Sequence, residues 1–137
     1  MIKKLYLIVF IISPLVLSGC LPKIGGGEKK AEADQFVQGS VVPSFPQTVP
    51  LYKDAKTVES FESMDSWGAS FVTEEDLNKV VEFYGTSLPA LGWEADLKKN
   101  ASYFTYNIKN EQYVGTIVIN KASDGKRTAI LASLTTR

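Results

Sequence analysis

The chain has no histidine, and its one cysteine, Cys20, lies near the N-terminus. With a single cysteine it can form no internal disulfide. Without histidine it also lacks the commonest acid–base catalyst and metal ligand at neutral pH. Zinc sites of cysteine and histidine, and Cys–His nucleophilic pairs, are therefore excluded within the chain. Carboxylate, hydroxyl, lysine and backbone chemistry remain, and we expect no catalytic residue, no metal site and no cofactor.

The chain also lacks an excess of basic residues. Its 15 lysines and arginines balance 15 acids. Lys3 and Lys4 precede Cys20, so the chain from Cys20 onward has 13 basic residues and 15 acidic ones. Because binding to a phosphate backbone depends on cationic side chains, we expect no nucleic-acid partner. A length of 137 residues with 45% hydrophobic composition indicates one packed domain.

The N-terminal residues have the three-part order of a secretory signal. Lys3 and Lys4 supply a positive start, and an apolar run over 5–17 follows, interrupted only by one serine and one proline. The run is shorter than the roughly 20 residues that a membrane-spanning helix needs. We expect 1–19 to be a cleaved signal peptide, and the alternative is an uncleaved anchor with a free thiol.

The sequence Leu17-Ser18-Gly19-Cys20 closes this run with a large aliphatic residue, two small residues and a cysteine. It resembles the lipobox of bacterial lipoproteins. The resemblance implies that Cys20 carries acyl chains such as palmitate, becomes the mature N-terminus and fastens an exported protein to the cell membrane. Leu21, in place of aspartate after the cysteine, favours the outer membrane where the organism has two membranes.

A lipidated N-terminus and flexible linker are predicted for 20–46, and a globular domain for 47–137. Gly25–Gly27 is followed by mixed charges without an apolar period, which is typical of a tether. The glycines lack the flanking strand and helix of a phosphate-binding loop. Pro43 and Pro46 have no backbone N–H to donate to a strand ladder, so the boundary is predicted near Gln47.

The clearest element is a helix predicted from Thr73 to about Leu88, with Thr73 as N-cap and Asp76 as its capping-box partner. Gly92 can supply the left-handed residue after the helix. One apolar stripe at helical spacing predicts the core-facing side: Leu77, Val80, Val81, Tyr84 and Leu88.

Strand patterns surround this helix, and Asp124-Gly125 is a strong hairpin signal. The order ββαββββ predicts an α+β fold, a mostly antiparallel sheet with one helix packed on a face. The predicted strands are 57–63, 67–72, 93–98, 103–108, 112–120 and 128–134.

Several dipeptides give a second resemblance: Leu51-Tyr52, Ala55-Lys56, Phe83-Tyr84, Leu88-Pro89 and Gly92-Trp93. In this pattern residues 50–93 resemble a widespread group of small bacterial lipoproteins and secreted domains. Their motifs are Leu-Tyr-x-x-Ala and Phe-Tyr followed by Leu-Pro-x-x-Gly-Trp. Lys53-Asp54 replaces the Pro-Gly that is usual in the group. The resemblance implies the fold and carries no activity.

Three aromatic residues, Tyr52, Tyr84 and Trp93, allow a ligand platform, but core packing is the favoured interpretation. The sequence from Ser123 to Lys126 matches a Ser-x-x-Lys nucleophile pattern. It spans an expected hairpin tip, and no Lys-Thr-Gly strand accompanies it, so a turn is favoured.

Paired carboxylates are the remaining catalytic candidate. Glu94 and Asp96 share a strand face, but Lys98 shares it too, which indicates a solvated edge and not a glycosidase pair. We therefore expect the protein not to be an enzyme.

The candidate interaction face comprises Tyr103, Thr105 and Thr116. Tyr103 alternates with Phe104 and Tyr106, so it lies on the opposite side of its strand, where tyrosine serves recognition or cross-strand packing. The leading hypothesis is a non-catalytic interaction module of the cell envelope that binds an envelope protein or glycan. The alternatives are a structural accessory subunit of an envelope assembly and a small-ligand carrier.

Overall fold

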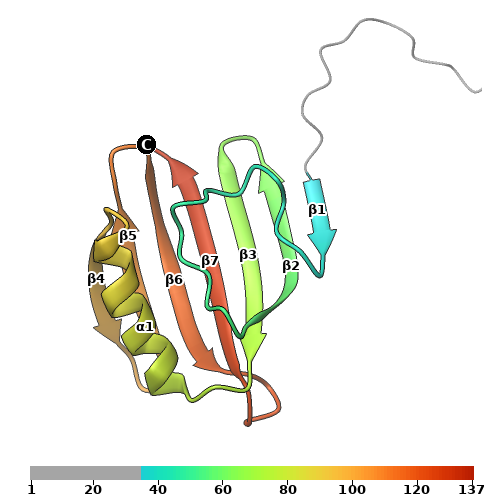
Figure 1. Cartoon of the computed structure of the whole chain (residues 1–137), viewed down its shortest axis with the longest axis vertical. Coiled ribbons are helices and arrows are strands. Elements are labelled where there is room, and N and C mark those ends of the chain that lie inside the picture. Colours follow the sequence, from blue (N-terminus) through green and yellow to red (C-terminus); the bar gives the residue numbers. More distant parts are fainter. Residues whose placement is uncertain (1–34) are drawn as a thin grey trace, which may run out of the picture.

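One antiparallel sheet of seven strands organises the computed structural model, which describes residues 35–137 (Figure 1). The strands are β1 (Gln35–Gln38), β2 (Lys56–Ser63), β3 (Ser66–Thr73), β4 (Glu94–Lys99), β5 (Tyr103–Lys109), β6 (Tyr113–Lys121) and β7 (Thr128–Thr136). Helix α1 (Leu77–Ala90) follows β3. Their spatial order is β1-β2-β3-β7-β6-β5-β4, so the last strand is central. The α+β class with a mostly antiparallel sheet is confirmed.

The predicted order ββαββββ is wrong in one detail, because β1 precedes the first predicted strand. Residues 35–38 pair antiparallel with β2, and Phe36 lies opposite Phe61. The ladder ends where the Gly39 amide donates to the Val58 carbonyl at 2.9 Å. The four residues are too few to show an alternation, but Phe36-Val37 is an apolar pair that fits an edge of β2.

Residues 39–55, which we call the covering segment, cross the same face of the sheet as α1 (Figure 1). Val42, Phe45 and Val49 of this segment are 2–6% exposed and belong to the core. Ser60 Oγ on β2 accepts a hydrogen bond from the Val42 amide at 2.7 Å, and the Trp93 indole donates to the Thr48 carbonyl at 2.7 Å.

The covering segment corrects the linker predicted to extend to residue 46. Its prolines keep it out of the sheet ladder, as expected. They do not keep it out of the core, where Pro46 and Pro50 are themselves buried. The folded part of the chain therefore starts at least as early as residue 35. The predicted signal peptide, Cys20 and the first part of the linker lie outside the described residues.

The N-cap of helix α1 lies three residues later than predicted. Asp76 is the N-cap, and its carboxylate accepts from the Asn78 amide at 2.8 Å. Thr73 is still part of β3, where it pairs with Thr128 of β7, and its hydroxyl accepts from the Glu75 amide at 3.3 Å. The strand ladder thus keeps Thr73 extended, and Asp76 takes the N-cap position instead.

The C-terminus of α1 follows the sequence prediction. Gly92 has φ of +88°, the left-handed conformation that glycine adopts without a Cβ clash. The Trp93 amide donates to the Leu88 carbonyl at 3.0 Å, and the Gly92 amide donates to the Pro89 carbonyl at 3.1 Å. This Schellman-type ending turns the chain back, so that Trp93 enters the core at 3% exposure before β4 starts.

The apolar stripe of α1 packs on the sheet as predicted. Val80, Tyr84 and Leu88 are at most 1% exposed, and Leu77 and Val81 are half-buried at its edges. Tyr106 of β5 reaches up from the sheet and donates its hydroxyl to the Val81 carbonyl at 2.7 Å. Burial raises the pKa of this phenol above its usual range. Apolar packing and this hydrogen bond therefore hold the middle of the helix against the sheet.

Replacing Val80 with alanine should lower the free energy of unfolding by about 1 to 3 kcal/mol, because it opens a cavity between helix and sheet. Glu82→Ala, on the exposed side of the same helix, is the matched control and should change it by less than about 0.5 kcal/mol. Denaturant unfolding of both variants measures the difference. Equal losses in the two would contradict the observed orientation of α1.

Candidate interaction face

The sheet has a second face, opposite α1 and the covering segment, which we call the open face. Alternate residues of all seven strands form it, and the pairing aligns them in rows across the sheet. One row contains Phe36, Phe61, Gly68, Ser133, Thr116, Asn107 and Asp96. No part of 35–137 folds back over these residues as α1 does over the other face (Figure 1).

The three predicted interaction residues lie on this open face. Tyr103 is opposite Asn120 of β6 and 40% exposed, and Thr105 is opposite Val118. Thr116 of β6 is in the next row, paired with Asn107 on one side and Ser133 on the other. These residues were inferred from strand alternation, and their observed orientation agrees with it. Tyr106, on the other side of β5, is buried under the helix.

Sequence reasoning missed the apolar part of the open face. Phe36, Phe61, Val114 and Leu131 have exposed fractions of 40–59%. Phe61 lies flat over Gly68 of β3, where any Cβ would clash with its ring. Its cross-strand neighbour Phe36 belongs to the stretch interpreted as linker, so the aromatic pair could not be recognised from the strand patterns.

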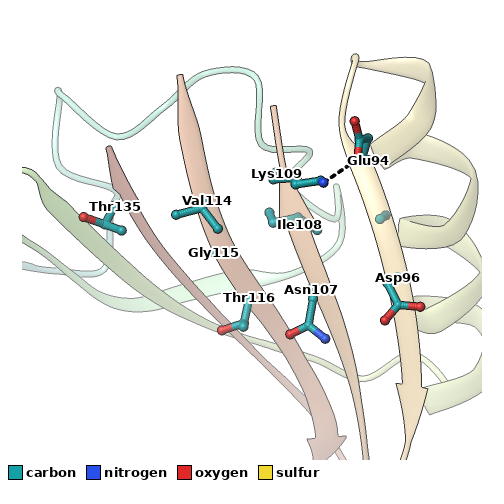
Figure 2. A pocket seen from close by; sticks show the side chains of 10 residues that line it. Glu94, Asp96, Asn107, Ile108, Lys109, Val114, Gly115, Thr116 and Thr135 are labelled. Atoms are coloured by element: carbon teal, nitrogen blue, oxygen red, sulfur yellow. Dashed lines mark ion pairs between the residues drawn. The ribbon is translucent and has the colours of Figure 1, made fainter. Parts of the chain in front are cut away.

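A hollow of about 570 Å³ lies on the open face over β4 to β7 (Figure 2). Asp96, Asn107 and Thr116 stand on neighbouring strands in one row of it. The Lys109 ammonium pairs with the Glu94 carboxylate at 2.9 Å, next to the row. The hollow thus has a mostly apolar lining with amide, hydroxyl and carboxylate groups side by side in one row.

A second hollow of about 590 Å³ lies further along β5 and β6. Tyr103 and Val118 line it together with Ser102, Asn120 and Lys121. An exposed aromatic ring beside amide and ammonium groups can make both stacking and hydrogen-bonding contacts. Thr105, between Tyr103 and Asn107 on the same face of β5, connects the two hollows.

The aromatic platform considered from the sequence is instead packed in the core. Tyr84 and Trp93 are 1% and 3% exposed, and burial raises the pKa of the Tyr84 phenol. Tyr52 packs edge-on against Phe83 with ring centres 5.0 Å apart. These rings fasten the covering segment to the helix and present no common surface.

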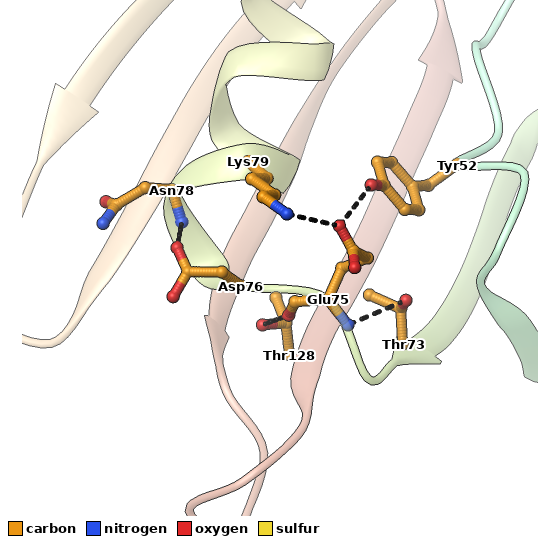
Figure 3. A network of polar contacts seen from close by, with 7 residues as sticks. All are labelled: Tyr52, Thr73, Glu75, Asp76, Asn78, Lys79 and Thr128. Carbon is orange, nitrogen blue, oxygen red and sulfur yellow. Dashed lines mark hydrogen bonds and ion pairs between the residues drawn. The ribbon is translucent and has the colours of Figure 1, made fainter.

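Glu75 connects three elements in a polar network beside these rings (Figure 3). Its carboxylate accepts from the Tyr52 hydroxyl at 3.4 Å and pairs with Lys79 at 3.5 Å. Burial and the nearby Glu75 carboxylate raise the pKa of Tyr52. The buried Thr128 hydroxyl donates to the Glu75 carbonyl at 2.8 Å, so the network ties β7, α1 and the covering segment together.

The Ser-x-x-Lys sequence forms the turn between β6 and β7, as favoured. Asp124 accepts from the amides of Lys126 and Arg127 at 2.8 and 2.9 Å. It also pairs with the Arg127 side chain at 2.6 Å. These hydrogen bonds lower the pKa of Asp124 to about 2. The serine and lysine flank a carboxylate that caps the turn, and nothing in this arrangement activates a nucleophile.

Within residues 35–137, no three acidic side chains come together as a cation site. No helix in that part of the chain has the length and apolar character needed to cross a membrane. Comparisons of the chain with protein-family models, with curated proteins and with solved structures found no match.

Proposed function

We propose that the protein is a membrane-anchored lipoprotein of the bacterial cell envelope whose folded domain is a non-catalytic interaction module. The open face is its binding surface. The observation that carries this proposal is the difference between the two sides of the sheet. One side is covered by α1 and the covering segment, while the other leaves large side chains such as Phe36, Phe61 and Leu131 between 42% and 59% exposed. Grouped apolar residues on a surface mark interaction sites.

The anchoring part of the proposal rests on the lipobox-like Leu17–Cys20. An acyl group on Cys20 would leave 14 residues before Gln35, the first described residue. At about 3.3 to 3.6 Å per residue, such a stretch spans at most about 50 Å. The folded domain would therefore start within that distance of a membrane, where partners fixed in the envelope are within reach.

The non-catalytic part rests on what the open face contains. The two acids of the hollow over β4 to β7, Glu94 and Asp96, lie on one edge strand, and Glu94 is paired with Lys109. The small-ligand carrier receives less support, since the layer between α1 and the sheet is filled by side chains at most 1% exposed, such as Val80 and Tyr84. A structural accessory subunit would use the same open face and differ only in its partner.

Radiolabelled palmitate should enter the wild-type protein and should not enter Cys20→Ser, because Cys20 is the only thiol in the chain. Expression in bacteria followed by gel autoradiography measures the label. Label that persists in the variant, or a mature wild-type protein that still begins at Met1, would refute the anchoring proposal.

Photo-crosslinking in cells tests the binding surface. A benzoylphenylalanine at Thr105 or Thr116 should give a discrete crosslinked product, because both face the partner in this proposal. The same residue at Glu82, on the exposed side of α1, is the control and should give none. Products of equal yield at all three positions, or at Glu82 alone, would show that the open face is not the binding surface.

A further inference from the structure

The two hollows of the open face are aligned along the same two strands. Tyr103 and Asn107 are on one face of β5, four positions apart in the strand. A strand rises roughly 3.3 Å per residue, which puts these two positions about 13 Å apart. An aromatic ring at one end and an amide–hydroxyl row at the other suit an extended ligand more than a compact one.

The polar row is available to a ligand. Asp96, Asn107 and Thr116 take part in none of the side-chain hydrogen bonds found among residues 35–137. The backbone at these three positions is nevertheless held in register, because β5 is paired with β4 on one side and with β6 on the other. Donors and acceptors held by a rigid sheet can bind a ligand with little cost in side-chain ordering.

The charge of the first hollow selects against anionic ligands. Lys109 is neutralised by Glu94 at 2.9 Å, which leaves the carboxylate of Asp96 unmatched by a cation in the same row. Lys98 follows two residues later on the same face of β4. Glu94, Asp96, Lys98 and Lys109 therefore balance in charge and give a phosphate or a polyanion no excess of positive charge. The ligand of this hollow should therefore be rich in hydroxyl and amide groups and carry no negative charge.

The backbone pairing of β5 and β6 favours a glycan over a peptide as the ligand. An extended peptide binds a sheet most directly by adding a strand, which requires an unpaired backbone edge. The first hollow reaches the edge strand β4, but a ligand that lies along β5 and β6 is over strands that are paired on each side. Recognition here has to use side chains alone. Hydroxyl and amide groups suit sugar hydroxyls, and the face of Tyr103 suits the C–H face of a sugar ring.

We propose that the open face over β5 and β6 binds a linear, uncharged glycan that lies along these strands. Its hydroxyl and acetamido groups contact Asp96, Asn107 and Thr116, and one sugar ring stacks on Tyr103. This inference rests on the proposed function, and it names the chemical class of the partner.

Full-length protein purified in detergent micelles should sediment with insoluble chitin and should bind chitotetraose in a calorimetric titration. Asn107→Ala, Thr116→Val and Tyr103→Ala should each weaken both interactions by about 3- to 10-fold, the range for one hydrogen bond or one stacking contact. Glu59→Gln, on β2 of the same open face, is the matched control and should bind like the wild type. Thermal unfolding verifies that each variant is folded.

The glycan inference is overturned if the wild type binds neither probe, or if folded variants bind as tightly as Glu59→Gln does. In both cases the crosslinks at Thr105 and Thr116 decide the wider proposal. A crosslinked envelope protein with no glycan binding leaves the interaction module standing with a protein partner. If neither glycan binding nor a crosslinked product is found, the open face is not a binding surface.

Discussion

The pairing of β7 between β3 and β6 is the constraint on which the rest of the structure depends. It joins the hairpin that precedes α1 to the three strands that follow it, and its register runs unbroken along both neighbours. Thr128, Ile130, Ala132 and Leu134 point to the covered side and are at most 2% exposed. A shift by one residue would send all four to the open face, so this register fixes the composition of both faces.

The covered side shows how a chain with no disulfide completes its core. One helix stripe covers β4 to β6, and the covering segment supplies Val42, Phe45 and Val49 over the rest. The Trp93 indole donates to the covering segment, and the Val42 amide of that segment donates to Ser60; these hydrogen bonds satisfy polar groups that burial would otherwise leave unpaired. The open side carries no such cover within 35–137, and its exposed rings and amide row are what the molecule presents to its surroundings.

Sequence patterns predicted what depends on local periodicity. Strict alternation placed Tyr103 away from Tyr106, and the helical stripe from Leu77 to Leu88 identified the packed side of α1. They failed where partners far apart in the chain decide the outcome. Thr73 is a good N-cap by residue type, but its pairing with Thr128 keeps it in β3. The sequence around Phe36 is typical of a tether, and only the pairing with β2 makes it a strand.

The candidate site was predictable only in part for the same reason. Tyr103, Thr105 and Thr116 follow from alternation within single strands. The hollow between Asp96, Asn107 and Thr116 depends on the register of three strands, and the Phe36–Phe61 pair depends on an edge strand outside the predicted domain. No pattern within one segment contains the register between strands. Asn107 lies on the same predicted face of β5 as Tyr103 and could have been included in the candidate interaction face.

The central claim is that the open face is occupied in the cell while the outer side of α1 is not. The domain from residue 35 onward contains no cysteine, so one introduced thiol reports on one position. Thr105→Cys should react with a small maleimide quickly in the purified protein and at least about tenfold more slowly in intact cells. Glu82→Cys should react at similar rates in both. Equal rates for Thr105→Cys in cells and in the purified protein would contradict the account.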